Sequence, residues 1–198
     1  MDRAGEEKLP LRERKRRRTQ ALLIETGRRL FEERGYDQTT VADIAAAAEI
    51  ASRTFFAYFE SKEQLLFSES DPRVTAALDA IRTRTVSETP AQVLLRALGD
   101  AAIDDEAGNP MAQLRLRLMA DVPAVQARAM RLQFAAQQQI AAALLAAYPE
   151  LDEVGAAALV GAFIGAVAAA FYSLGDKDDA EARMRQVRAA VTKALNQR

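Results

Sequence analysis

Positively charged side chains cluster near the start of the chain. Between residues 8 and 18 only Glu13 opposes seven basic residues, which are Lys8, Arg12, Arg14, Lys15, Arg16, Arg17 and Arg18. Arginine-rich clusters neutralise nucleic-acid phosphates and supply the sequence-independent part of DNA affinity. A solvated, disordered tail is the alternative, because a basic run alone does not define a partner. The residues that follow the cluster decide between these interpretations.

The side chains that most enzymes use are missing. The 198-residue chain contains no cysteine and no histidine, which excludes disulfides, thiolate metal sites and Ser-His-Asp hydrolysis. No carboxylates cluster at ligand spacing, so a metal effector is disfavoured. With 27 basic and 28 acidic residues the net charge is only -1, so the basic cluster is a local feature. We therefore predict a binding protein without a cofactor rather than an enzyme.

The elements that position these charges are predicted to be helices. The chain is rich in alanine, the best helix former, and has only 9 glycines and 6 prolines. No run alternates β-branched or aromatic residues with polar ones as a strand does. Residues 1–10 are charged and lack the apolar segment of a signal peptide. We expect an all-α cytoplasmic protein.

Two short helices are predicted directly after the basic cluster. The first runs over about 19–34 and ends at Gly35, a left-handed C-terminal cap. The second begins at Thr40, which forms a capping box with Asp43.

A brief turn at 49–51 leads from the second helix into a third, over about 52–59. Phe55 and Phe59 are the expected buried side chains of this third helix. Two short helices joined by a tight turn are typical of a helix-turn-helix, whose second helix enters the DNA major groove. The basic cluster just before this motif favours the DNA-binding interpretation.

The helix-turn-helix and the segments on either side of it contain a characteristic set of residues, which are Leu30, Phe31, Arg34, Gly35, Tyr36, Thr39, Thr40, Val41, Asp43, Ile44, Ala45, Ala47, Ala48, Ile50, Thr54, Phe55, Phe56, Tyr58, Phe59, Ser61, Lys62, Glu63 and Leu65. Through this set, residues 17–77 resemble the N-terminal domain of the tetracycline-repressor (TetR) family. Two positions depart from the family pattern. Glu49 stands where the family usually has glycine, so we expect either a less tight turn or a positive φ at Glu49. Ala51 replaces the usual capping serine, and Ser52 is expected to cap the third helix instead.

The resemblance implies two sets of DNA contacts. Base contacts are implied for Ser52, Arg53, Thr54 and Phe56. Phosphate contacts are implied for Thr39, Thr40, Tyr58 and Lys62, to which the basic cluster adds Arg14, Arg16, Arg17 and Arg18. Arg53 is the best candidate for a base contact, because a guanidinium can bind O6 and N7 of guanine together. The alternatives are a phosphate contact for Arg53 and a surface ion pair of Lys62 with Glu60 or Glu63.

The rest of the chain is predicted to be a second helical unit. Helices are expected at about 62–84, 91–103, 110–119, 123–148, 151–174 and 178–196, which makes about nine in all. Pro72 is expected to kink or split the first of them. We predict a basic arm over 1–16, a DNA-binding domain over 17–77 with its helix-turn-helix at about 40–59, and a ligand-binding and dimerisation domain over 78–198.

One helix of this unit, within 154–175, contains no charged residue. Its length permits a membrane span, but its small residues and single bulky stripe favour a helix buried in a core or subunit interface. The resemblance implies that the last two helices form a four-helix bundle with those of a second copy. The predicted interface residues are Leu159, Phe163, Val167, Phe171, Met184, Val187 and Val191. Packing within one subunit is the alternative.

The resemblance also implies a ligand pocket between the middle helices. The candidate pocket residues are Arg115, Met119, Phe134, Gln137 and Tyr172. We predict a homodimeric transcriptional repressor that a small organic ligand releases from a palindromic DNA operator. The alternatives are a DNA-binding dimer of the same fold without such a ligand, acting as an activator or with a protein partner, and a helical enzyme.

Overall fold

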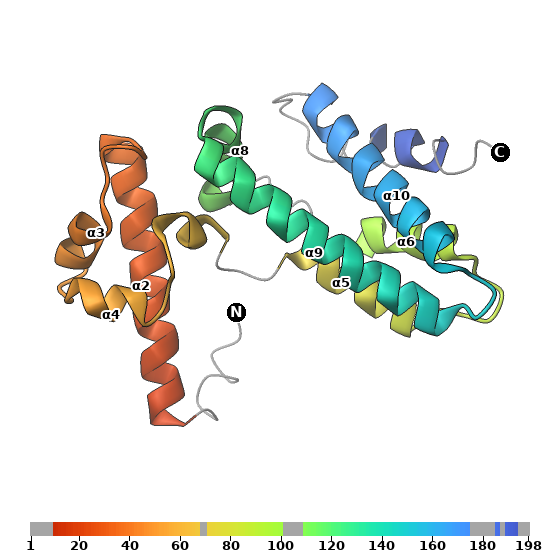
Figure 1. Ribbon diagram of the computed structural model, residues 1–198, viewed down its shortest axis with the longest axis horizontal. Helices are drawn as coiled ribbons and strands as arrows, with labels where there is room; N and C mark the ends of the chain where they lie inside the picture. The colour runs from red at the N-terminus through yellow and green to blue at the C-terminus, as the bar shows by residue number, and fades with distance from the viewer. Residues whose placement is uncertain (1–9, 68–70, 101–108, 175–184, 187–188, 194–198) are drawn as a thin grey trace. The chain divides into compact units, whose positions relative to one another are not determined.

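The computed structural model describes residues 10–67, 71–100, 109–174, 185–186 and 189–193, and every regular element in these residues is a helix (Figure 1). Contacts divide the chain into two compact units. The N-terminal unit comprises residues 1–68 and 110–128, and the C-terminal unit comprises residues 69–109 and 129–198. The domain boundary predicted at residue 77 stays a prediction. Residues 110–128, which the sequence analysis put in the second domain, are grouped by their contacts with residues 1–68.

The N-terminal unit is built around one long helix. Its elements are α2 (Leu11–Arg34), α3 (Val41–Ala47), α4 (Ser52–Phe56), the 3-10 helix η1 (Lys62–Phe67), α8 (Pro110–Asp121) and the start of α9 (Pro123–Ala147). Its core joins side chains from all of these elements, with Leu23, Ile44, Phe55, Leu65 and Val125 all fully buried. Leu114 and Val125 show that α8 and α9 complete the core of this unit.

The helix α2 is longer than the sequence predicts. It begins at Leu11 rather than near residue 19, so most of the basic cluster is helical and continuous with the domain that follows. Arginine and lysine are good helix formers, and Arg17 pairs with Glu13 one turn away at 3.4 Å. The helix ends at Gly35, whose φ of 86° confirms the predicted need for glycine, although its ψ of 154° is extended rather than left-handed helical.

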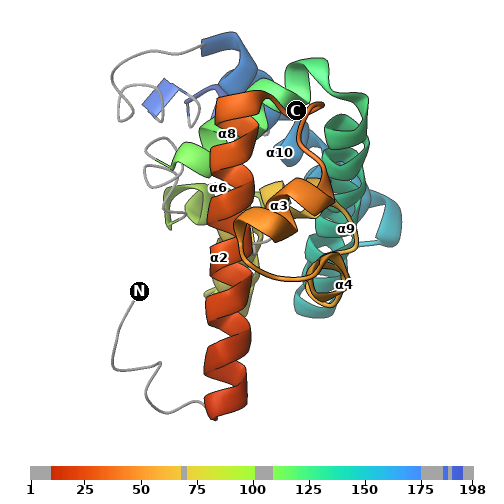
Figure 2. The same ribbon diagram turned by 90° about the vertical axis from the view of Figure 1, so that its left-hand side faces the viewer.

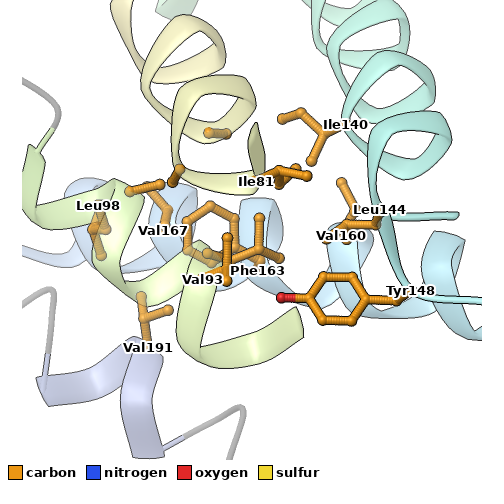
Figure 3. Close-up of a cluster of buried hydrophobic side chains, with 14 residues drawn as sticks. Ile81, Val93, Leu98, Ile140, Leu144, Tyr148, Val160, Phe163, Val167 and Val191 are labelled. Atoms are coloured by element: carbon orange, nitrogen blue, oxygen red, sulfur yellow. The ribbon is translucent and has the colours of Figure 1, made fainter. Parts of the chain in front are cut away.

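The C-terminal unit contains α5 (Pro72–Arg82), α6 (Pro90–Asp100), the rest of α9 and α10 (Glu153–Leu174). Pro72 splits the helix expected over 62–84: it is the first residue of α5, whose N-cap Asp71 accepts a 2.9 Å bond from the backbone N–H of Arg73. The core packs Val93 of α6, Leu144 of α9 and Val160 of α10 together (Figure 3). Most of these side chains are aliphatic and small.

One polar network ties the elements of the C-terminal unit together. Arg96 of α6 binds Glu88 in the preceding loop at 2.8 Å and donates to the carbonyl of Ala80 at 2.9 Å. The hydroxyl of Tyr148 donates to the carbonyl of Glu88 at 3.1 Å. The hydrogen bond from Arg96 and a second from the N–H of Thr85 lower the pKa of Glu88 to about 2.

The helix α10 is apolar on every face, and only one face is buried in its own unit. Phe163 and Val167 lie on the buried face, where Val191 also packs (Figure 3). The predicted interface assignment is therefore corrected for these three residues, which are core of a single chain, while Leu159 is half-buried against the same core. Met184, Val187 and the side chain of Phe171 lie outside the described residues.

The opposite face of α10 has small side chains and open space in front of it. Val154 is 77% exposed, and Ala158 and Gly165 are exposed as well. A Cβ placed on Gly161 or Gly165 meets no described atom within 4 Å. Across the described residues, no helix combines the length and hydropathy that crossing a membrane requires.

Candidate nucleic-acid interface

The short helix α4 separates anchoring side chains from exposed ones. Phe55 is fully buried and Phe59, just beyond the helix, is 2% exposed, with their ring centroids 5.6 Å apart. Ser52, Arg53 and Phe56 lie on the exposed side, and Phe56 is 56% exposed although it is aromatic. Thr54 is half-buried at the edge of this surface. The four predicted base-contact residues thus share one helix, which the two phenylalanines fix to the core.

The helix α3 is placed by the capping box that the sequence predicts. The hydroxyl of Thr40 accepts from the backbone N–H of Asp43 at 3.1 Å, and the Asp43 carboxylate accepts from the backbone N–H of Thr40 at 2.8 Å. Hydrogen bonds from the hydroxyl and the backbone N–H of Thr40 hold the pKa of Asp43 below its usual value. Ile44 and Ala45 face the core. The predicted capping box is confirmed. It uses the hydroxyl of Thr40, the residue for which the resemblance implies a phosphate contact.

The turn between α3 and α4 is strained at one residue. Glu49 has a φ of 57°, which confirms the positive φ expected where the family usually has glycine. The expected cap is wrong: Ala51 is the N-cap of α4 and makes no side-chain bond, and Ser52 is already inside the helix. The helix holds its position through Phe55 and Phe59 instead.

Thr39 does not have the role that the resemblance implies for its side chain. The residue is completely buried, and its hydroxyl donates to the carbonyls of Gly35 at 2.8 Å and Leu30 at 3.2 Å. A buried hydroxyl that already hydrogen-bonds the end of α2 cannot reach a phosphate. The assignment is corrected: Thr39 fixes the loop between α2 and α3.

Lys62 fixes the same loop from the other side. Its ammonium group donates to the carbonyls of Tyr36 at 2.7 Å and Thr39 at 3.0 Å, and lies 4.1 Å from the centre of the Tyr36 ring. The Tyr36 hydroxyl donates to Glu63, so burial first and this carboxylate second raise the pKa of Tyr36. Two of the three donors of Lys62 are thus bound within the chain. A phosphate contact by Lys62 stays a prediction, as does one by the half-buried Tyr58.

The remaining phosphate candidates lie on the extended part of α2. Arg14, Arg16, Arg17 and Arg18 are all exposed on the helix. Among these four arginines, the described contacts show an ion pair for Arg17, which pairs with Glu13.

The predicted pocket residues are divided between the two units. Arg115 and Met119 belong to the N-terminal unit, where Met119 packs against the core. Phe134 and Gln137 lie on α9 in the C-terminal unit, and Phe134 is 62% exposed. The side chain of Tyr172 lies outside the described residues. Each of these assignments stays a prediction.

Arginines far along the chain reach the N-terminal unit's helices, and the sequence did not reveal them. Arg115 donates to the carbonyl of Leu66 at 3.2 Å, and Arg117 lies 4.0 Å from a carboxylate oxygen of Glu32. Arg128 lies 3.7 Å from Glu60, and its Nε is buried without a hydrogen-bond partner among the described residues. No local pattern signals such contacts, because the partners are many tens of residues apart.

Comparisons with known proteins agree with this geometry. The profile described as "Bacterial regulatory proteins, tetR family" matches residues 23–68, which hold the second half of α2, the helix-turn-helix and η1. A TetR-family regulator from Shewanella sp. PV-4 is 25% identical, with a TM-score of 0.54 over 90% of this chain and 96% of that one. Residues 23–68 of the chain belong to the TetR family.

Curated relatives match the chain over less than half of its length. The regulator TcmR of Streptomyces glaucescens is 42% identical over 84 residues, which are 42% of this chain and 37% of TcmR. The repressor DhaR of Mycobacterium sp. (strain GP1) is 39% identical over 64 residues, or 29% of this chain and 32% of DhaR. The chain thus spans about a third of the length of these relatives. TetR proteins are helix-turn-helix transcriptional regulators and not enzymes.

Proposed function

We propose that this TetR-family protein is a homodimeric repressor that reads a palindromic DNA operator with α4 and leaves it when a small organic ligand binds. The observation that carries the proposal is the exposed surface of Ser52, Arg53 and Phe56 on a helix anchored by two buried phenylalanines. A surface of this kind fits the major groove, where side chains contact base edges. The relative DhaR is named a repressor, which favours repression.

Arg53 is the residue on which base reading is proposed to depend. A guanidinium bound to a guanine gives about 1–3 kcal/mol of discrimination. A duplex is selected from a random-sequence pool with the wild-type protein, and binding is then measured by fluorescence anisotropy. Arg53→Ala is expected to weaken binding to the selected duplex by about tenfold to a hundredfold while binding to random duplex changes little.

The matched control is Arg82→Ala, which removes an exposed arginine of α5 that pairs with Asp79 at 3.0 Å. This variant should bind both duplexes like the wild type. Equal losses on selected and random DNA in Arg53→Ala would make Arg53 a phosphate contact.

Dimerisation is proposed through the open small-residue face of α10. Two-fold symmetric regulators present two recognition helices to the two halves of a palindrome. Gly165 lies on this face and a side chain there clashes with nothing in the described part of the chain, so Gly165→Leu is expected to leave the subunit folded and hold a partner helix away. Ala127, an exposed residue of α9 in the N-terminal unit, supplies the matched control Ala127→Leu. Light scattering should show a dimer for the wild type and for Ala127→Leu, and a monomer for Gly165→Leu. A dimeric Gly165→Leu protein would place the interface elsewhere.

The effector is proposed to be an amphipathic organic molecule. A protein of the same fold, FadR of Thermus thermophilus, is solved with lauroyl-CoA; it is 19% identical with a TM-score of 0.55. Lauroyl-CoA is therefore the first probe, added to the complex with the selected duplex, with coenzyme A as the control. Release by lauroyl-CoA alone supports an amphipathic effector, and an unchanged affinity argues against an acyl-CoA.

A further inference from the structure

The first two turns of α2 form a positively charged helical extension. They hold Arg12, Arg14, Lys15, Arg16, Arg17 and Arg18. In both views of the structure this part of α2 projects past α3 and α4 (Figures 1 and 2). At 1.5 Å per residue the stretch from Leu11 to the position where the helix was expected to begin is ~12 Å long.

The helical register divides these charges between two faces. Arg12 precedes Leu30 by roughly five full turns and Arg16 precedes Leu23 by roughly two, so both arginines continue the face on which Leu23 and Leu30 are buried. That face packs against α3, α4 and η1, yet Arg12 and Arg16 are exposed because they lie beyond these elements. Arg14 and Arg18 lie on the roughly opposite side of the helix.

The charge pattern is unfavourable for an isolated helix. Cations in the first turn oppose the positive end of the helix dipole. The pairs Arg12 with Arg16 and Arg14 with Arg18 place like charges one turn apart, which also destabilises a helix. Glu13 offsets part of this charge through its 3.4 Å pair with Arg17. A polyanion lying along one face would relieve both effects.

We propose that this extension binds the phosphate backbone of the duplex beside the segment that α4 reads, through Arg12 and Arg16. The inference rests on the proposed DNA-reading function and adds a contact surface to it. The major groove is about 12 Å wide, so a strand at its edge lies within the length of the extension. A helix that is already ordered loses less freedom on binding than a flexible arm does.

Two double variants test the register directly. Arg12→Ala/Arg16→Ala removes two positive charges from the helix face on which Leu23 and Leu30 are buried. Arg14→Ala/Arg18→Ala removes two positive charges from the opposite face. Binding of each to a random-sequence duplex is measured by anisotropy over a fourfold range of KCl, with circular dichroism to verify folding. The slope of log K against log salt is negative, and each lost phosphate contact makes it less steep by about 0.9.

We expect Arg12→Ala/Arg16→Ala to make the slope less steep by about two per bound chain. The fourfold salt increase should then weaken the DNA binding of this variant about tenfold less than that of the wild type. Arg14→Ala/Arg18→Ala should keep the wild-type slope. Equal reductions in the two variants would show a flexible arm without register, and no reduction in either would show a solvated helix; both results overturn the proposal.

The proposed function fails separately from this inference. If no duplex can be selected and Arg53→Ala binds like the wild type, base reading by α4 is wrong, while the slope difference on random DNA still tests the extension. If Arg53→Ala loses selectivity and the two double variants are alike, the reading function stands and the extension does not bind DNA.

Discussion

The N-terminal and C-terminal units both have a buried apolar core, and they differ in the polar contacts that are added to it. In the N-terminal unit, single polar groups bind particular backbone atoms: Lys62 binds two carbonyls, Thr39 two more, and Arg115 the end of η1. In the C-terminal unit, aliphatic side chains fill a common core, and one polar network centred on Arg96 and Glu88 joins α5, α6 and the end of α9. A bond to one atom requires one residue type, whereas a core mainly requires volume.

The largest expected effect comes from emptying each core in turn. Phe55→Ala should destabilise the N-terminal unit by about 3–5 kcal/mol, and Leu144→Ala the C-terminal unit by about 2–5 kcal/mol, because both side chains are fully buried. Hydrogen exchange read by peptide should rise over 23–67 in the first variant and over 140–167 in the second. Exchange that rises over both segments in both variants would show one cooperative core instead of two.

Two helical glycines make a sharper comparison with a smaller effect. A Cβ on Gly27 would lie 2.5 Å from Cδ1 of the fully buried Leu65, so Gly27→Ala should cost about 1–3 kcal/mol. A Cβ on Gly161 meets no described atom of its own subunit, so Gly161→Ala should gain up to about 1 kcal/mol of helix stability when it is made in the monomeric Gly165→Leu protein. Urea unfolding measures both. A destabilised Gly161→Ala protein would indicate that another surface covers this face of α10.

A pair of loop glutamates gives the third test. Glu49 has a positive φ, which asparagine tolerates better than glutamate, so Glu49→Asn should stabilise the protein by up to about 1 kcal/mol. Glu150, in a loop of the C-terminal unit, has no positive φ, and Glu150→Asn should change the thermal midpoint little. An equal gain in the two variants would mean that removal of a negative charge, and not strain, is responsible.

The smallest effect concerns acid. Because the folded-state pKa of Glu88 is about 2 and its ordinary value is 4.5, its ion pair stabilises the C-terminal unit fully above the ordinary value and ceases to do so as the pH falls toward 2. Thermal midpoints measured down this range should fall less steeply in Glu88→Gln than in the wild type. Parallel pH profiles would show that this carboxylate does not contribute.

The sequence predicted the N-terminal unit well where short-range patterns determine the structure. The capping box of Thr40 and Asp43 and the burial of Phe55 and Phe59 follow from neighbours within a few residues, and the positive φ at Glu49 follows from the family resemblance. The burial of Thr39 and the two acceptors of Lys62 depend on contacts between distant elements, and no spacing reveals them. The start of α2 was missed because like charges suggested an arm without regular structure.

The sequence predicted the helices of the C-terminal unit, but it did not predict which face of each helix is buried. On α10 every side is apolar, so hydrophobic periodicity has no minimum that marks the outer face. Bulky side chains at 163 and 167 suggested an interface, yet they fill the core of their own chain. The side chains exposed on the opposite side are mostly small, as at Ala158 and Gly165.

The separation of buried and exposed side chains around α4 affects how such a protein can come to recognise a new DNA sequence. Its anchors, Phe55 and Phe59, are separate residues from those it exposes, and no described hydrogen bond within the chain involves the side chains of Ser52, Arg53 or Phe56. Replacing the exposed residues therefore leaves the fold intact, so drift at these positions carries little stability penalty. A gene duplicate could change its operator by a few substitutions while keeping every element in place, and the same positions are the natural sites at which to engineer a regulator for a chosen sequence.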